Sequence, residues 1–418
     1  MNGRHKRISG LSGNEIYFLE RMGYRPGQLC VGNSVVALGI AKGIGAGLST
    51  LGGGEIEEVT HLVHDGRLRA YERMMNEART YGGVGLTGVS FDLVNHGGNL
   101  EFITLGSTIH KKDATADGGF GDEVKFSTSA DVAKLFCQVD AGFRPIRFVF
   151  GNVAYSIGVG GTILGGLRSL ARGEVPQYTE IFDHTRRLAL NRITDEARSL
   201  GANAVVGIET TITPLLGAQE MMMVGTASHH PLLGDPPLTP VTSDMTNEEL
   251  WNMANVGFLP VRLVMGVSVY SLGLKGGIFS ALQTLGGGEV SGLTEILYEA
   301  REKALARIEK DAQMCGADEV VGVKTNIYDL GGGLIEFMAI GTAVKRIEGA
   351  KTKSANLPPQ AVMQDRETFI DTSNPRTSVV NADKSSAASA SKTQRGPLSI
   401  LIFVVIIIFY LIRFFGHR

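Results

Sequence analysis

The chain has 418 residues, enough for two to four ordinary domains. Hydrophobic residues make up 43% of it and charged residues 20%, so globular cores can form, and the net charge of -2 gives no bulk attraction to nucleic acid or anionic lipid. The three cysteines stand far apart in the sequence, which argues against a disulfide framework and fits a reducing compartment. The first residues, MNGRHKRISG, are partly basic but lead into no apolar run, so no signal peptide is predicted.

The strongest pattern is an internal repeat. The run GLSTLGGGEIEEVT returns as GLRSLARGEVPQYT and again as ALQTLGGGEVSGLT, and the elements around it return in the same order. A short helical stretch ends in a glycine, which is Gly23, Gly142 or Gly257, and an apolar strand, the Gly-rich run, a long helix and two strands follow. We therefore predict three tandem domains, over residues 14–110, 130–230 and 246–346.

Each repeat is expected to fold as β-α-β-β, which places the protein in the α+β class. In the third repeat the long helix is predicted over about 294–314, because Leu297, Ala300, Ala304 and Ile308 keep the spacing of one buried stripe. A threonine is expected to cap the start of each long helix and a glycine to end it. These residues are Thr60, Thr179 and Thr294 at the starts, and Gly82, Gly201 and Gly316 at the ends.

The segments outside the repeats have a different composition. Residues 111–125 and 231–244 look like linkers, and the adjacent pair His229 and His230 is expected to be solvated. Residues 350–397 are rich in Ser, Ala, Lys, Asn and Thr and poor in large apolar groups. We expect them to form a disordered linker.

An uncharged apolar run, LSILIFVVIIIFYLI, follows this linker at residues 398–412. A helix of that length spans ~22 Å at ~1.5 Å per residue, short of the ~20 residues that a bilayer prefers. Phe414 and Phe415 extend the run, and Arg413 can reach the headgroups. We predict one transmembrane helix at 398–415, a single-pass C-terminal anchor that leaves the repeats in the cytoplasm. Basic residues flank both sides, so the flanking charge does not determine the orientation.

Each repeat resembles the YbjQ family, which is labelled as a heavy-metal-binding domain. The resemblance rests on the Gly-rich run into GGGE, the helix YEAREKALARIEKDAQMCGADEVVGV and the closing MAIGTAV of the third repeat, and on SLGANAVVGI of the second. The first repeat departs from it, reading TYGGVGLTGV, so its helix end is expected to differ. The resemblance covers most of residues 14–346 and contains no catalytic motif. It implies a small α+β subunit that assembles into rings, pentameric in single-domain members.

Polar residues that recur in all three repeats are the candidate site. One reading is an acidic and basic ligand site at subunit junctions, and the other is a set of salt bridges within or between subunits. The residue four positions after the second arginine is always acidic, a spacing that puts both groups on one helix face. A further carboxylate, at Glu101, Glu220 and Glu336, opens the last strand and is expected at an edge or interface. The candidates are Glu55, Glu174 and Glu289; Arg67, Arg186 and Arg301; Arg73, Arg192 and Arg307; and Glu77, Glu196 and Asp311.

A metal site is the alternative. His61 and His64 lie three apart on the first turns of a helix and can share a metal. Their counterparts are Glu180 and Asp183, then Glu295 and Tyr298, so the pair does not recur, and no cysteine recurs either. Exposed polar residues at a helix start explain the same pattern. The sequence therefore predicts no resident cofactor, with a heavy metal as the open alternative.

Neither a phosphate-binding loop nor a hydrolase triad is present, and a basic aromatic surface for nucleic acid is missing. We expect a non-enzymatic, tail-anchored membrane protein whose repeats form an oligomeric scaffold or binding module. The alternative is a protein that binds heavy metals or small ligands at repeat or subunit junctions. The expected partners are further copies of the chain and the lipid bilayer. Two chains in a six-place ring and five chains in stacked rings both fit, and divergence of the repeats favours stacking of like with like.

Overall fold

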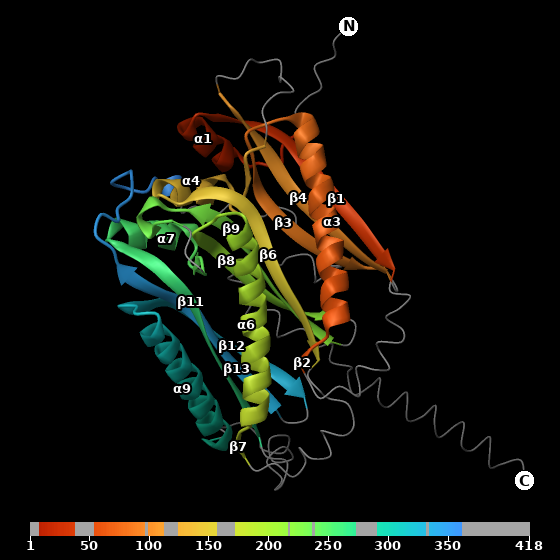
Figure 1. Cartoon of the computed structure of the whole chain (residues 1–418), viewed down its shortest axis with the longest axis vertical. Coiled ribbons are helices and arrows are strands. Elements are labelled where there is room, and N and C mark those ends of the chain that lie inside the picture. Colours follow the sequence, from red (N-terminus) through yellow and green to blue (C-terminus); the bar gives the residue numbers. More distant parts are fainter. Residues whose placement is uncertain are drawn as a thin grey trace, which may run out of the picture. The chain divides into compact units, whose positions relative to one another are not determined.

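The computed structural model describes residues 8–37, 54–96, 99–112, 124–156, 172–215, 218–235, 239–272, 291–331 and 334–361. All of them lie within one compact unit, residues 1–364. Three β/α repeats follow one another along the chain (Figure 1), which confirms the α+β class and the three tandem copies.

The first repeat begins with a short helix, α1, that is followed by a long strand, a two-residue strand, a long helix and a hairpin. Ser12 caps α1 through a reciprocal pair of hydrogen bonds with Glu15, and Gly23 ends it with a φ of 77°. The elements are α1 (Gly13–Met22), β1 (Tyr24–Ala37), β2 (Gly54–Glu55), α3 (Glu57–Tyr81), β3 (Gly85–Asn95) and β4 (Asn99–Lys111).

The second and third repeats follow the same plan, apart from residues 273–290 of the third, which are not described, and each adds a two-residue strand in front of its short helix. The second contains β5 (Phe126–Ser127), α4 (Val132–Asp140), β6 (Arg144–Ser156), β7 (Gly173–Glu174), α6 (Pro176–Ser199), β8 (Ala204–Leu215), β9 (Ala218–His229) and η1 (Pro231–Leu233). The third contains β10 (Val241–Thr242), α7 (Asn247–Asn255), β11 (Phe258–Ser271), α9 (Ser291–Met314), β12 (Glu319–Gly331), β13 (Leu334–Arg346) and η2 (Pro359–Ala361).

The sheets exchange strands between neighbouring repeats. Their strand orders are β1-β4-β3-β5, β10-β8-β9-β6-β2 and β12-β13-β11-β7. The short Gly-Glu strand of one repeat pairs antiparallel with the first strand of the next, β2 with β6 and β7 with β11. In return, β5 and β10 pair parallel with β3 and β8 of the preceding repeat. Each pair of neighbours is therefore joined in both directions.

Each long helix crosses the first strand of its own repeat at a glycine. A Cβ on Gly32 would stand 2.0 Å from the carbonyl oxygen of Ala70 in α3, and a Cβ on Gly266 would stand 1.9 Å from that of Ala304 in α9. Only glycine permits this close approach of helix to sheet. The helices α3 and α6 also pack on the first strand of the following repeat, β6 and β11.

The apolar cores cross the repeat boundaries as well. One core combines Val59, Val63 and Phe102 of the first repeat with Ala154 and Leu215 of the second, and a second core is shared in the same way by the second and third repeats. Because these cores are buried only when neighbours are in place, the three repeats stabilise one another.

The short helices form a further core. Phe18 of α1, Cys137 of α4 and Trp251 of α7 all contribute to it. The indole Nε1 of Trp251 donates to a carboxylate oxygen of Asp140, at 2.7 Å. This core therefore links all three repeats at one more place.

Several expectations about capping are corrected. The long helices start before the predicted threonines, with Ile56 and Val175 as N-caps that make no side-chain cap bond. Thr60 and Thr179 lie inside the helices, where their hydroxyls contact the next repeat instead. The glycines at the helix ends are as predicted, since Gly201 and Gly316 have φ values of 71° and 66°.

The linkers hold more structure than their composition indicated. Residues 241–242 form β10, and residues 350–361 lie along α4 and α7 rather than in a disordered segment. His230 is buried against the ring of Phe143, at 4.5 Å between centroids, and is not solvated. Residues 362–397, the remainder of the linker predicted over 350–397, lie outside the described residues.

The stacking of like with like is also wrong for this chain, because both sides of the second repeat are occupied by unlike neighbours. No helix in the described part of the chain is both long and apolar enough to cross a bilayer. The predicted anchor at 398–415 lies outside that part, as do residues 38–53, 157–171 and 273–290, which hold the first portion of each Gly-rich run.

Candidate functional site

The junction between the first and second repeats is centred on a buried ion pair. Arg67 of α3 donates from both Nη atoms to the carboxylate of Glu220 on β9, with Nη2 at 2.7 Å from Oε2. The side chain of Arg67 is 3% exposed and that of Glu220 is 0% exposed. Because two charges out of water are stable only when fully paired, the two repeats must be in place together for either residue to be buried.

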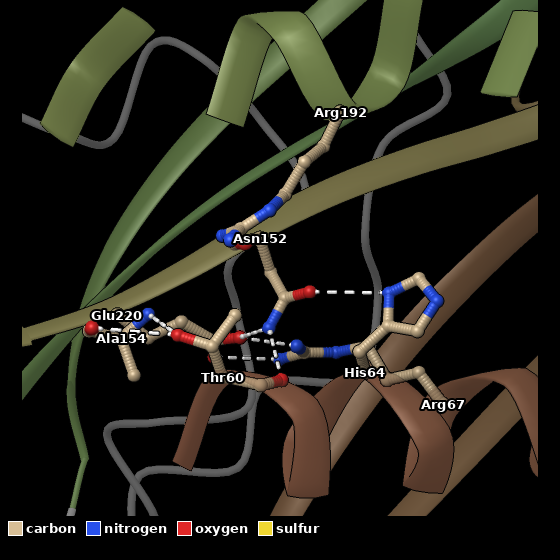
Figure 2. A network of polar contacts seen from close by, with 7 residues as sticks. All are labelled: Thr60, His64, Arg67, Asn152, Ala154, Arg192 and Glu220. Carbon is tan, nitrogen blue, oxygen red and sulfur yellow. Dashed lines mark hydrogen bonds and ion pairs between the residues drawn. The ribbon is translucent and has the colours of Figure 1, made fainter. Parts of the chain in front are cut away.

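A polar network surrounds this pair (Figure 2). Asn152 of β6 donates from Nδ2 to Glu220 at 3.1 Å and to the carbonyl oxygen of Thr60 at 3.2 Å, and its Oδ1 lies 3.3 Å from Nδ1 of His64. The hydroxyl of Thr60 accepts from the backbone N–H of Ala154 at 2.9 Å. Burial lowers the pKa of His64, so its neutral form is favoured here.

The second junction repeats the same arrangement with different neighbours. Arg186 of α6 donates to Glu336 on β13 through Nε and Nη2, at 2.8 to 3.2 Å, and both side chains are fully buried. The guanidinium stacks over the ring of Tyr155 at 4.5 Å. Burial alone would lower the pKa of Arg186, but the nearby carboxylate of Glu336 more than offsets burial. The pKa of Arg186 is therefore raised. Thr179 accepts from the backbone N–H of Val269 at 2.9 Å.

A second ion pair accompanies each short exchanged strand. Glu55 of β2 lies 2.7 Å from Nη2 of Arg192, and Glu174 of β7 accepts from Nη2 of Arg307 at 2.6 Å. Each arginine also donates from Nη1 to a strand carbonyl of its own repeat, Arg192 to Asn152 and Arg307 to Val267. The Gly-Glu strands are thus held by both backbone pairing and charge.

The predicted candidates fall into two groups. The structure brings together Glu55 with Arg192, Glu174 with Arg307, and the first arginines with carboxylates of the last strand, all between repeats. It does not form the expected helix-face pairs. Glu77 and Glu196 accept backbone N–H groups of Val31 and Phe150 instead, and Asp311 pairs with Arg187 of the preceding repeat. Outside the junctions, Arg73 donates to the carbonyl oxygen of Asn33, Arg301 pairs with Glu302, and Glu289 lies outside the described residues.

The histidines proposed as metal ligands have different surroundings. His61 is exposed on α3, whereas His64 faces the junction with its ring 4.9 Å from that of Phe150. The described residues contain no group of three His, Cys, Asp or Glu side chains arranged to hold a metal. Burial raises the pKa of the Cys30 and Cys137 thiols to about 12, so both stay protonated and are poor metal ligands. In the described part of the chain, the residues present do not fit a heavy metal.

Sequence reasoning missed which residues meet. The recurrence of Glu101, Glu220 and Glu336 pointed to an interface, but nothing in one repeat indicates that its carboxylate pairs with an arginine of the preceding repeat. The recurring threonines were assigned to helix caps because their spacing before the long helix suits that role. Their recurrence alone was the signal for the junction.

Comparison with known proteins supports this picture. The profile of a family described as "Putative heavy-metal-binding", YbjQ, matches three times, at residues 24–109, 143–230 and 259–347. The chain therefore belongs to the YbjQ family, and the suspected resemblance and the three copies are confirmed.

Relatives occur in two sizes. An encapsulin nanocompartment protein of Mycobacterium tuberculosis is 29% identical over 239 residues, which cover 55% of this chain and 89% of that protein. A UPF0145 protein of Archaeoglobus fulgidus is 45% identical over 80 residues, 19% of this chain and 74% of its own length. A UPF0145 protein of Vibrio campbellii is 40% identical over 80 residues, covering 19% of this chain and 77% of that protein. The two UPF0145 proteins are thus similar to a single repeat.

Proposed function

We propose that this protein is a non-catalytic scaffold that assembles with further copies of itself. The observation that carries the proposal is the recurrence of one buried Arg–Glu pair at both repeat junctions. Residues kept alike in all three repeats are used there to join β/α units, with their donors and acceptors directed at each other rather than into a substrate cavity. The similarity to a protein named for an encapsulin nanocompartment supports a role in assembly.

The apolar segment 398–415 is proposed to hold this scaffold at a membrane, with the repeats on the cytoplasmic side. The support is its sequence: fifteen uncharged residues, mainly β-branched and aromatic, after a polar linker. A membrane tether would bring several copies to one surface and raise their effective concentration for assembly.

Membrane attachment is tested by fractionation of cells expressing the full chain, the chain lacking 398–418, and Val405→Asp. The deletion is expected to release the protein from membranes. The charge at the centre of the apolar run, at a cost of about 3 kcal/mol, is expected to weaken attachment. Ala387→Asp, in the preceding polar segment, is the control and should fractionate like the unmodified chain. A truncated protein that stays with membranes after a high-salt wash would refute the anchor.

The heavy-metal alternative receives less support. The junction carboxylates are already paired with arginines, and the buried thiols are protonated. Metal analysis of the purified full chain is the decisive measurement. Stoichiometric zinc or copper that is lost on replacing His61 and His64 would favour the alternative over a scaffold without metal.

A further inference from the structure

The two ends of the row of repeats carry complementary halves of a junction. At each internal junction, one repeat supplies a long helix with its arginine and the next supplies a first strand and a carboxylate. Among the described residues, no repeat packs before the first or after the third. In the first repeat, strand β1 stands at the edge of its sheet, at the place where β2 and β7 add to β6 and β11.

The edge of β1 has the apolar surface that a junction buries. Val35 lies opposite Glu101 in the sheet, as Ala154 lies opposite Glu220 and Val269 opposite Glu336. Val35 is 57% exposed, whereas Ala154 and Val269 are fully buried under the preceding repeat. Val31, at the position of the buried Phe150, is exposed as well.

Within the described ranges, the charged residues at the β1 edge also lack the partners from a preceding repeat that their counterparts have at the internal junctions. Glu101 is the counterpart of Glu220 and Glu336, but its polar partners in the described part of the chain are His96 and Asn33 of its own repeat, at 2.7 and 3.4 Å. Arg73, the counterpart of Arg192 and Arg307, is exposed and donates to the carbonyl oxygen of Asn33. Unlike its counterparts, Arg73 has no acidic partner among the described residues.

The third repeat presents the other half. Arg301 of α9 stands where Arg67 and Arg186 stand on α3 and α6, but it is 45% exposed and pairs with its neighbour Glu302. Tyr298, one turn earlier, is exposed too. On β12, Val323 is 41% exposed, although Val89 and Ile208 at the same position are buried and donate their N–H groups to the segment before the next repeat.

The segment that would cover β12 exists at the front of the chain. The N-caps of the three short helices are Ser12, Asp131 and Thr246. The residue four positions before each cap is Ile8 in the first repeat, Ser127 in the second and Thr242 in the third. Ser127 and Thr242 are buried beside the preceding repeat, whereas Ile8 is exposed. The buried ion pair, the packing of a long helix on the next first strand, and the pairing of the segment before the short helix therefore each have one half at each end of the described chain.

From this complementarity we propose that a second copy of this chain docks head to tail. Its β1 edge lies against α9 and β12 of the first copy, and Arg301 pairs with Glu101 across the contact. The inference rests on the proposed assembly function and names the surface that carries it. The contact is heterologous, and the exposed ends show that one chain does not close it alone. Two chains with six repeats make the smallest closed ring.

The test uses charge reversal in the full chain, purified in a mild detergent and measured by sedimentation equilibrium with the detergent density-matched. The unmodified chain is expected to associate, with two chains as the smallest closed species. Arg301→Glu and Glu101→Arg each place like charges in the contact, and each should weaken association by about 100-fold or more. Arg198→Glu reverses an exposed arginine of the middle repeat, away from both ends, and should associate like the unmodified chain.

Mixing the two reversed chains gives the sharpest outcome. One contact of the mixed ring then joins the carboxylate introduced at position 301 of one chain to the guanidinium introduced at position 101 of the other, and the second contact is the native pair. Association should return in the mixture, although each variant alone associates about 100-fold more weakly than the unmodified chain. A monomeric unmodified chain, or reversals without effect on its association, would overturn the inference. Reversals without effect on a chain that does associate would leave the proposed self-assembly standing, whereas a monomeric unmodified chain would refute that function as well.

Discussion

The two internal junctions use the same ion pair in different surroundings. Around Arg67 and Glu220 the neighbours include a polar group, Asn152, which donates to the same carboxylate, beside the ring of Phe102 at 5.6 Å from the guanidinium. Around Arg186 and Glu336 the neighbours are aromatic, and among the described residues the hydrogen bonds to Glu336 all come from Arg186. The ion pair sets how two repeats meet, and the neighbours make each junction specific to its own pair of repeats. The second junction should therefore depend more strongly on its arginine than the first.

The largest effect is expected from Arg186→Met. It leaves the carboxylate of Glu336 fully buried and without a donor, so the free energy of unfolding should fall by about 3–5 kcal/mol. Denaturant unfolding of the full chain in detergent, followed by circular dichroism, measures it. Arg198→Met, at an exposed position, is the control and should change stability by less than about 0.5 kcal/mol. A loss of that small size for Arg186→Met would mean that the pair does not hold the junction.

Arg67→Met should cost less, about 2–3 kcal/mol, because Asn152 still donates to Glu220 after the arginine is removed. The same unfolding experiment measures the difference between the two junctions. Adding Asn152→Ala to Arg67→Met removes the remaining donor and should bring the loss up to that of Arg186→Met. Equal losses for the two single arginine variants would show that the surroundings do not distinguish the junctions.

Thr60→Val and Thr179→Val are expected to cost about 1–2 kcal/mol each, because a buried backbone N–H of the next repeat loses its acceptor. Hydrogen exchange at Ala154 and Val269, read by mass spectrometry of the surrounding peptides, should accelerate in the respective variant. Faster exchange confined to the first turns of α3 or α6 would instead restore the helix-cap interpretation.

The smallest effect is a pH dependence at the first junction. Burial lowers the pKa of His64 from 6.5, so the unfolded chain takes up this proton first as the pH falls. The contribution of neutral His64 to the free energy of unfolding is therefore fully present above the unfolded-state pKa of 6.5. It is lost as the pH falls through the lower pKa of the folded chain. His64→Gln should flatten the loss of stability between about pH 7 and pH 5. His61→Gln, on the exposed face of α3, is the matched control. If neither variant changed how steeply the free energy of unfolding falls with pH, His64 would not be the group responsible.

The sequence was sufficient to predict the repeats, the long helices and the glycines that end them. Hydrophobic periodicity and left-handed turns depend on residues that are close together in the chain. The sequence also singled out the arginines and glutamates of the junctions, but not Asn152 or Tyr155. It could not pair the arginines with the glutamates, since Arg67 and Glu220 belong to different repeats and meet only through strand exchange. The helix-face pairing of Arg73 with Glu77 failed for a different reason: the backbone N–H of Val31, on β1 of the same repeat, donates to Glu77 at 2.6 Å. Buried His230 shows that linker composition does not reveal tertiary contacts.

A double-mutant cycle on Arg186 and Glu336 tests the central claim most directly. Arg186→Met and Glu336→Met each leave one buried charge, while the double variant leaves none and places two apolar side chains in the junction. We predict that the double variant loses less free energy of unfolding than either single variant, with a coupling of about 2 kcal/mol or more. Losses that add to within about 0.5 kcal/mol would contradict a junction held by this pair.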